Sequence, residues 1–537
     1  MLHDRRVTNE LRSPDRPVVH TPAGPVRGTD DGRVRVFRGI RYAAPPTGAR
    51  RWCAPVPPEP WTDPVDGSRF GAIAPQPPNP VINLGPQAVQ DEDCLFLNVW
   101  SAAAVRPGDA CPVMVWVHGG AYLLGSGSQP IYDAADLVAD GDLVVVTINY
   151  RIGALGFLDL TSVAPDSGVD ANPALQDVLL ALRWVRDSIA AFGGDPGRVT
   201  LAGESAGGGL VTTLMTVPAA AGLFHRAIAQ SSPATSVFDR HRARTVTEVF
   251  LDRAGLRADA GAGSGTNGGA ADLLPALRSL PIGPLLRAAT GTYDTIPTTS
   301  PGVLAFFPVV DGSLVPEHPL DAFLAGRQHP VPLLIGTNKD EASLFARMSA
   351  PIMPVAPDTI RGMFGRLAQE RPDVTLPTED RVLSAYTGVR AKGRGLAVAR
   401  DIGFRMPAVW LAQAHASVAP TYLYRFDWAT PLLRLLRIGA THATELPYLW
   451  GNLVAGPKDP TFKLGGLRTG RVLSARMQQR WRSFIAGDGP DAPGAPAWPA
   501  FDPRGRATMV IDREDVLVGD LDAELRAAWG PTVLAFR

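Results

Sequence analysis

Short runs of apolar residues, each ended by glycine or polar residues, recur along the chain and predict buried strands. The runs at 112–117 and 143–148 are almost wholly apolar, as expected for strands that are covered on both faces. Comparable runs lead into polar residues near 338 and 428. Between these runs, apolar residues recur with a helical period over 173–192, which predicts a helix. The alternation of strands and helices predicts an α/β fold with a mainly parallel sheet.

The pattern changes at the start and in the middle of the chain. Residues 18–39 alternate short apolar segments with turn residues, which predicts a β-meander. Residues 254–418 are expected to be mostly helical, apart from 307–312 and 331–338. Within that region, 254–271 is rich in glycine and is expected to be a flexible surface insertion.

Composition narrows the classes of partner. The 537 residues are 45% hydrophobic and carry a formal net charge of zero, which argues against a nucleic-acid partner or an anionic membrane. No apolar run reaches the roughly 18 residues of a membrane-spanning helix. Residues 1–16 are polar and charged, without the apolar core of a secretory signal. We interpret them as a disordered leader preceding a single domain over 17–537.

The clearest chemical motif is Gly-Glu-Ser-Ala-Gly at 203–207. It follows a strand-like segment ending near Leu201 and precedes small apolar residues that can begin a helix. This is the context in which G-x-S-x-G forms a nucleophile elbow. Ser205 is the candidate nucleophile, and the Ala206 N–H at the helix start is placed to favour an anionic intermediate.

A serine nucleophile of this kind is followed along the chain by an acid and then a histidine. Asp340 and Glu341 both follow an apolar strand, and the residues alone do not choose between them. Two histidines come later. His415 lies in a segment that is expected to be helical, whereas His442 lies in a loop after a strand. A base on a loop held by a rigid strand is the better candidate, so we expect His442.

A second motif, His-Gly-Gly-Ala-Tyr at 118–122, follows the buried strand at 112–117. A glycine pair there lets backbone N–H groups point toward a developing oxyanion. This turn and the serine elbow together predict acyl-transfer chemistry.

Five segments together resemble the type-B carboxylesterase family of α/β-hydrolases, over about residues 18–529, and within it the bacterial para-nitrobenzyl-esterase-like enzymes. The segments are Glu92–Trp100, His118–Tyr122, Asn149–Gly153, Phe192–Pro196 together with Val199–Gly208, and Gly336–Glu341. The resemblance implies an α/β-hydrolase fold whose large helical insertions, mainly within 232–420, cap the active site. It also implies a serine carboxylic-ester hydrolase that needs no cofactor and no metal.

Residue by residue, the resemblance assigns Ser205 as nucleophile, Glu341 as acid and His442 as base. It assigns the oxyanion donors and the supporting positions as well. The oxyanion donors are the backbone N–H groups of Gly120, Ala121 and Ala206, and the supporting residues are Gly119, Glu204 and Ser231. It further implies two loop-fixing ion pairs, Arg51 with Glu92 and Arg151 with Asp177.

The cysteines are informative about the cellular compartment in which the protein works. Secreted relatives bridge the cysteine of Glu-Asp-Cys to one about 20 residues upstream, where this chain has Ala74. We therefore expect Cys53, Cys94 and Cys111 to be free and the protein to be cytoplasmic. We expect it to act as a monomer or weak homodimer.

The substrate is predicted to be a short to medium acyl or aryl ester. The segment at 76–91 is short and rich in proline, which limits the mobility that an interfacial lid needs. The small residues of the 119–121 turn leave room for bulky alcohol groups. The alternatives are a lipase, an amidase or carbamate hydrolase, a transacylase or, less favoured, a non-catalytic cholinesterase-like binding protein.

Overall fold

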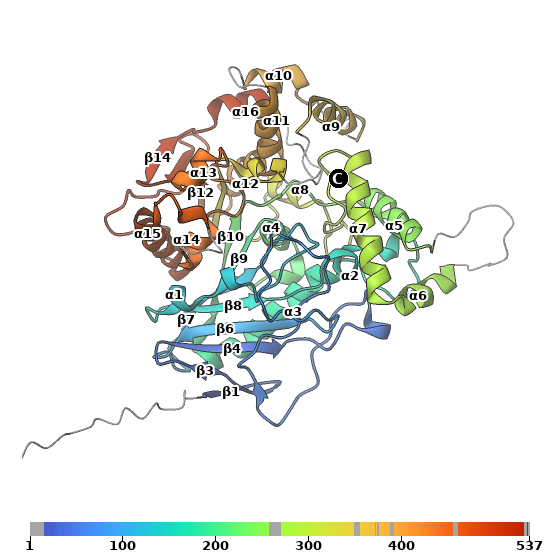
Figure 1. Ribbon diagram of the computed structural model, residues 1–537, viewed down its shortest axis with the longest axis vertical. Coiled ribbons are helices and arrows are strands. Elements are labelled where there is room, and N and C mark those ends of the chain that lie inside the picture. Colours follow the sequence, from blue (N-terminus) through green and yellow to red (C-terminus); the bar gives the residue numbers. More distant parts are fainter. Residues whose placement is uncertain are drawn as a thin grey trace, which may run out of the picture.

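The computed structural model describes residues 16–256, 270–347, 355–370, 372, 375–386, 391–454, 460–530 and 534. The expected leader at 1–16 lies outside these residues except for Arg16, and so does most of the glycine-rich insertion at 254–271. Within the described residues, an 11-stranded sheet forms the centre of the molecule (Figure 1). Its strands, in spatial order, are β14 (Val516–Gly519), β13 (Ala507–Ile511), β12 (Thr421–Phe426), β11 (Leu333–Asn338), β10 (Arg226–Gln230), β9 (Gly194–Glu204), β7 (Cys111–Val117), β8 (Val144–Ile148), β6 (Phe96–Ala102), β4 (Val34–Arg41) and β3 (Thr29–Asp30).

The central strands run parallel, as the sequence predicts. The pairings β8·β7, β7·β9, β9·β10, β10·β11, β11·β12 and β12·β13 are all parallel. The pairs toward both edges, β13·β14 on one side and β8·β6, β6·β4 and β4·β3 on the other, are antiparallel. The carboxyl ends of β9, β10 and β11 therefore meet at one edge of the sheet, and the residues that follow them are brought together.

The sheet is buried on both faces. Along β7, Val113, Val115 and Val117 belong to one apolar cluster, while Met114 and Trp116 belong to another. This alternation follows from the period of two in a strand. It explains why the run is wholly apolar, since each successive side chain meets a different layer of helices.

Helices cover the two faces and one end of the sheet. Figure 1 shows α5, α6 and α7 on one side, α14 and α15 on the other, and α9, α10, α11 and α16 gathered at the top. The α-helices are α1 (Ala135–Val138), α2 (Gly153–Phe157), α3 (Pro173–Ser188), α4 (Ala206–Leu214), α5 (Arg240–Arg253), α6 (Ala270–Ser279), α7 (Ile282–Thr299), α8 (Pro319–Leu324), α9 (Pro357–Glu370), α10 (Glu379–Ser384), α11 (Ala391–Arg400), α12 (Met406–His415), α13 (Pro431–Leu435), α14 (Leu446–Trp450), α15 (Leu467–Ala486) and α16 (Ala523–Trp529).

The expected meander at 18–39 is only partly correct. β1 (Val18–Thr21) and β2 (Gly24–Arg27) pair antiparallel, but β2 then pairs with β5 (Val65–Asp66) in a separate small sheet. β4 joins the large sheet through β6. Neighbouring strands along the chain are therefore divided between two sheets, because the partner of β4 comes about 60 residues later and the local pattern does not reveal it.

Candidate active site

Ser205 lies at a sharp turn between β9 and α4. Its backbone adopts φ 56° and ψ −124°, a strained conformation for a residue with a side chain. A Cβ at Gly207 would lie 2.0 Å from the carbonyl oxygen of Val117, and one at Gly203 would lie 2.6 Å from the carbonyl carbon of Gly207. The two glycines are therefore required because strand and helix approach too closely for any side chain.

Three residues from three different strand ends form a hydrogen-bonded chain. The Ser205 Oγ lies 2.8 Å from Nε2 of His442. The other ring nitrogen, Nδ1, lies 2.6 Å from Oε2 of Glu341. Because a carboxylate only accepts, Nδ1 donates to it, and Nε2 is left to accept the serine proton. His442 follows β12 in the chain, Glu341 follows β11 and Ser205 follows β9.

The second oxygen of Glu341 is held by two further donors. Ser231 Oγ donates to Oε1 over 2.6 Å, and the backbone N–H of Asn338 donates to the same atom over 2.7 Å. Ser231 comes directly after β10, and its backbone has φ 47°. Glu341 is fully buried, so its position is set by these contacts and not by solvent.

The competing candidates of the sequence lie elsewhere. Asp340 accepts the N–H of Ala440 and makes no contact with the imidazole of His442. His415 is buried on α12, where its ring nitrogens pair with Gln328 Nε2 and the carbonyl of Val331. It is a core histidine on a helix, as its apolar surroundings in the sequence indicate.

The turn at 119–121 lies against the serine elbow. A Cβ at Gly119 would lie 3.1 Å from Cβ of Ser205 and 2.8 Å from Oε2 of Glu204. Gly120 and Ala121 have φ of 122° and 54°. Within the described residues, the N–H groups of Gly120, Ala121 and Ala206 donate to no acceptor. These three unpaired donors are available for an oxygen of a bound molecule.

His118 supports this turn from behind, a role that the sequence did not reveal. Its ring stacks on Tyr150 at 4.4 Å between centroids, and its Nδ1 lies 2.8 Å from the carbonyl oxygen of Gly119. The Tyr150 hydroxyl donates to the backbone oxygen of His118. Burial lowers the pKa of His118 to about 4, so the ring is neutral and acts as a structural support.

Three buried carboxyl groups surround the His442 imidazole. Besides Glu341, Oε1 of Glu204 lies 3.2 Å from Nε2 of His442, and Glu445 accepts from Gln230 and Asn338 nearby. Burial raises the pKa of Glu204 to about 8, with His442 opposing that shift. Burial lowers the pKa of His442, but the carboxylates of Glu204 and Glu341 outweigh it and raise that pKa overall. The site therefore favours a positive charge on the imidazole.

Two aromatic rings enclose the imidazole of His442 on its remaining side. The ring centroid of Phe404 lies 4.7 Å from that of His442, and that of Phe345 lies 5.1 Å away. Phe404 belongs to a π-helical turn, Asp401–Arg405, at the start of α12. Such a turn is uncommon and is often found at functional sites.

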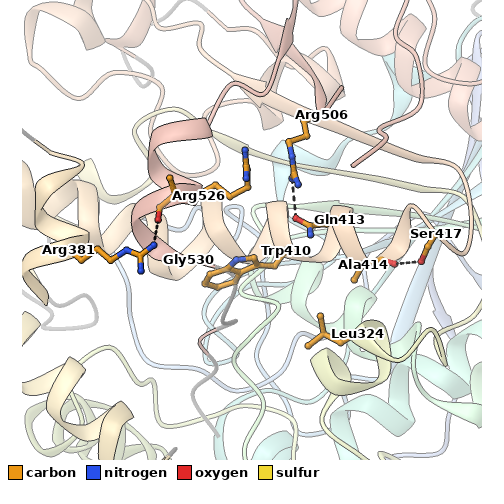
Figure 2. A pocket seen from close by; sticks show the side chains of 10 residues that line it. Leu324, Arg381, Trp410, Gln413, Ala414, Ser417, Arg506, Arg526 and Gly530 are labelled. Atoms are coloured by element: carbon orange, nitrogen blue, oxygen red, sulfur yellow. Dashed lines mark hydrogen bonds between the residues drawn. The ribbon is translucent and has the colours of Figure 1, made fainter. Parts of the chain in front are cut away.

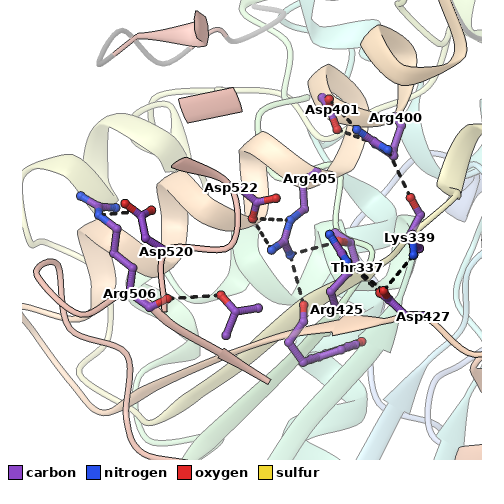
Figure 3. Close-up of polar contacts among 12 residues, drawn as sticks. Thr337, Lys339, Arg400, Asp401, Arg405, Arg425, Asp427, Arg506, Asp520 and Asp522 are labelled. Carbon is purple, nitrogen blue, oxygen red and sulfur yellow. Dashed lines mark hydrogen bonds and ion pairs between the residues drawn. The ribbon is translucent and has the colours of Figure 1, made fainter. Parts of the chain in front are cut away.

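Arg405 anchors that π-helical turn to the sheet through hydrogen bonds (Figure 3). Arg405 is buried, and its guanidinium group donates to Asp522, to Thr337 Oγ1 and to the carbonyl oxygen of Tyr424. Arg400 at the end of α11 pairs with Asp401, the next residue in the chain. A shift of the backbone at Arg405 would leave its buried guanidinium group unpaired, which costs free energy.

The two ion pairs expected from the resemblance are present. Arg51 pairs with Glu92, and Arg151 donates to Asp177 over 2.7 Å in a fully buried contact. The three cysteines are free, as expected. Among the described helices, none is long and apolar enough to cross a membrane.

The comparisons with known proteins decide the family. The model of the carboxylesterase family matches residues 15–528. The chain belongs to the carboxylesterase family. It is similar to a para-nitrobenzyl esterase of Bacillus subtilis, at 35% identity over 96% of this chain and 99% of the relative. It is also similar to a phenmedipham hydrolase of Pseudarthrobacter oxydans, at 33% identity over 93% and 96% of the two chains.

Solved structures agree with this assignment. A para-nitrobenzyl esterase structure superposes with a TM-score of 0.80 at 33% identity, over 96% of this chain and 100% of that one. A carboxylesterase of Geobacillus stearothermophilus superposes equally well, with a TM-score of 0.80 at 34% identity over the same shares. The fold is therefore the α/β fold expected from the sequence, and the protein is a carboxylic ester hydrolase.

Proposed function

We propose that this carboxylesterase acts through a Ser205–His442–Glu341 triad and an acyl-enzyme intermediate on short to medium acyl or aryl esters. The observation that carries the proposal is the continuous hydrogen-bonded chain from Ser205 Oγ through both nitrogens of His442 to Glu341. A nucleophile, a base and an orienting acid in that order are what serine catalysis requires.

In the first half-reaction, Ser205 Oγ attacks the ester carbonyl carbon while His442 Nε2 takes its proton. Glu341 holds the imidazole in the tautomer that accepts at Nε2 and stabilises the imidazolium that forms. Ser231 and Asn338 keep Glu341 in place. His442 then protonates the departing alkoxide, so the alcohol leaves and the acyl group remains on Ser205.

The tetrahedral intermediate carries its negative charge on the former carbonyl oxygen. The N–H groups of Gly120, Ala121 and Ala206 are the donors we assign to it. Each such donor contributes about 3 kcal/mol to the transition state. Water then attacks the acyl-enzyme, again with His442 as base, and releases the carboxylic acid and Ser205.

Several features support the substrate class. The segment at 76–91 contains no helix and no strand within the described residues, and it contains four prolines, at 77, 78, 80 and 86. It offers no amphipathic helix for docking on a lipid droplet. Similar proteins are named para-nitrobenzyl esterase, phenmedipham hydrolase and fumonisin B1 esterase.

Two experiments test the proposal. A fluorophosphonate probe should label the wild-type protein and not the Ser205→Ala variant. Labelling that persists in the variant would place the nucleophile elsewhere, and a wild type that is never labelled would favour a non-catalytic protein.

The second experiment measures rate against concentration for tributyrin and for p-nitrophenyl esters of increasing chain length, with p-nitroanilides as amide counterparts. We expect smooth saturation below the solubility limit, with a preference for acyl chains of about two to eight carbons and slow anilide hydrolysis. A steep rise once droplets form would favour a lipase, and equal anilide turnover would favour an amidase.

A further inference from the structure

A cavity of about 480 Å³ lies among α8, α10, α12, α16 and the start of β13. Its lining contains no residue of the triad or of the 119–121 turn. Cavities of this size accommodate small organic molecules. Figure 2 shows the indole of Trp410 at its centre, with Arg381 on one side and the guanidinium groups of Arg506 and Arg526 above it.

Positive charge at this cavity exceeds negative charge. Asp520 is the one carboxylate, within the described residues, that pairs with any of the three arginines: it lies 2.5 Å from Arg526 and 4.0 Å from Arg506. No carboxylate among the described residues pairs with Arg381. Burial lowers the pKa of Arg506, and repulsion from Arg526 adds to that shift, while Asp520 and the neighbouring Asp502 oppose it. Three guanidinium groups therefore face two carboxylates, and positive charge remains in excess.

The guanidinium groups are held in place by neutral acceptors. Arg381 donates to the carbonyl oxygen of Ala527 over 2.8 Å, and Arg506 donates to Oε1 of Gln413 over 3.1 Å (Figure 2). Each contact uses one nitrogen of the guanidinium fork, so the other nitrogens can still donate. Arginines that are already positioned lose little conformational entropy on binding an anion.

The rest of the lining is apolar or small. Trp410 is buried on α12, and Leu324 lies at the cavity edge with 58% of its surface exposed. Ala414 and Gly530 add no polar side chain. The enclosed N–H groups of Trp410 Nε1 and Arg526 Nε have no acceptor in the described part of the chain. Unpaired N–H donors beside apolar side chains suit a ligand that has an anionic group and an apolar body.

We infer that this cavity binds a small organic carboxylate, with the carboxylate among Arg381, Arg506 and Arg526 and an aromatic or alkyl body against Trp410 and Leu324. The planar guanidinium fork suits a carboxylate, and the indole face suits a flat or extended apolar group. The inference concerns binding and does not depend on which residues perform the hydrolysis.

The test is calorimetric titration of the full-length protein with 4-phenylbutyrate, its neutral analogue 4-phenylbutanol, and inorganic phosphate. We expect 4-phenylbutyrate to bind more tightly than either of the other two. Arg381→Gln and Arg526→Gln should each weaken its binding about tenfold or more, because each removes a charged donor. Leu324→Ser should weaken 4-phenylbutyrate but leave phosphate unchanged.

Controls separate this site from other effects. Arg244→Gln removes an exposed guanidinium on α5 that pairs with Glu248, and it should leave the affinity unchanged. Ser205→Ala should also bind 4-phenylbutyrate like the wild type, whatever its activity, and Arg381→Gln should keep the wild-type kcat/KM.

Four results would overturn the inference. They are no binding of 4-phenylbutyrate up to about 10 mM, equal affinity for 4-phenylbutanol, phosphate binding as tight as that of 4-phenylbutyrate, or an affinity that neither arginine substitution alters.

Discussion

The surroundings of His442 and the arginine-bordered cavity are opposite in charge and differ in how that charge is balanced. Around the imidazole, the carboxyl groups of Glu204, Glu341 and Glu445 are all buried. In the cavity, Arg506 and Arg526 pair with Asp520, and Arg381 pairs with no carboxylate of the described residues. Each region therefore holds more charge of one sign than its own ion pairs can neutralise.

The two regions resolve this excess differently because the side chains differ in chemistry. A buried carboxyl group can take up a proton, and burial raises the pKa of Glu204 to about 8. A guanidinium group keeps its charge at any ordinary pH. The carboxyl-rich site can therefore close around a histidine, whereas the arginine cluster has to stay open to water or to an anion. The experiments below alter one region at a time.

The largest effect is expected from removing the imidazole that the three carboxyl groups surround. His442→Ala should lower kcat/KM for p-nitrophenyl esters by about 10⁴- to 10⁶-fold, nearly as much as Ser205→Ala, since triad losses are not additive. Steady-state kinetics with both variants measures this. His415→Ala is the matched control at the other candidate histidine, which lies on α12, and near-wild-type activity of His442→Ala would show that the base is misassigned.

The next effect distinguishes the two adjacent acids. Glu341→Gln leaves a neutral amide beside Nδ1 of His442 and should lower kcat by about 10⁴-fold, because the imidazolium loses its stabilising charge. Asp340→Asn keeps an oxygen that can accept from the N–H of Ala440, so its kcat should change by less than about threefold. A larger loss in Asp340→Asn than in Glu341→Gln would reverse the assignment of the acid.

The pH profile tests how the carboxylates act on the imidazole. A general base must be neutral, so kcat/KM should rise as pH rises through the pKa of His442. Glu204 is a cause of the upward shift of that pKa. Glu204→Gln removes its negative charge and should move the acidic limb to lower pH by about one unit. An unchanged limb would mean that Glu204 carries no charge while His442 titrates. Glu248→Gln, on the exposed surface of α5, is the control.

Ser205 and the 119–121 turn could be named as candidates from the sequence because each lies in a short contiguous motif next to a strand end. His442 was chosen by its place in a loop after a strand. The choice of Glu341 over Asp340 came only from the family resemblance, since adjacent acids have the same spacing to everything else. Glu445, His118 and Phe404 were missed. Glu445 and Phe404 join the site through contacts across the fold, and neither stands in a pattern that distinguishes it from a core residue. His118 lies in the 118–122 motif, but the motif alone does not show that its ring supports the turn.

The fold shows the same limit. Strands buried on both faces were predicted within one or two residues, as for β7 and β8, because their apolar runs are uninterrupted. The separation of β2 from β4 into two sheets depends on β5 and β6, which come much later in the chain. The sequence also does not predict the arginine-bordered cavity, because Arg381, Arg506 and Arg526 are far apart in the chain and only the fold brings them together.

The smallest expected effects are on stability, when one carboxylate is removed from each region and the two variants are compared. Asp520 has φ 46°, a conformation that asparagine tolerates, so Asp520→Asn changes the charge with little strain. It leaves Arg506 and Arg526 without the carboxylate that pairs with both of them. Because these groups are partly exposed, the expected loss is only about 0.5 to 1 kcal/mol in the free energy of unfolding.

Glu204→Gln should have a smaller effect on stability, because a carboxyl group whose pKa is about 8 is largely protonated at neutral pH and resembles the amide already. Urea denaturation at pH 7 and low salt measures both changes. Added salt should reduce the loss in Asp520→Asn, since it screens the repulsion between the exposed arginines. A larger loss in Glu204→Gln than in Asp520→Asn would mean that Glu204 is ionised at pH 7, and that the two regions balance their charge in the same way.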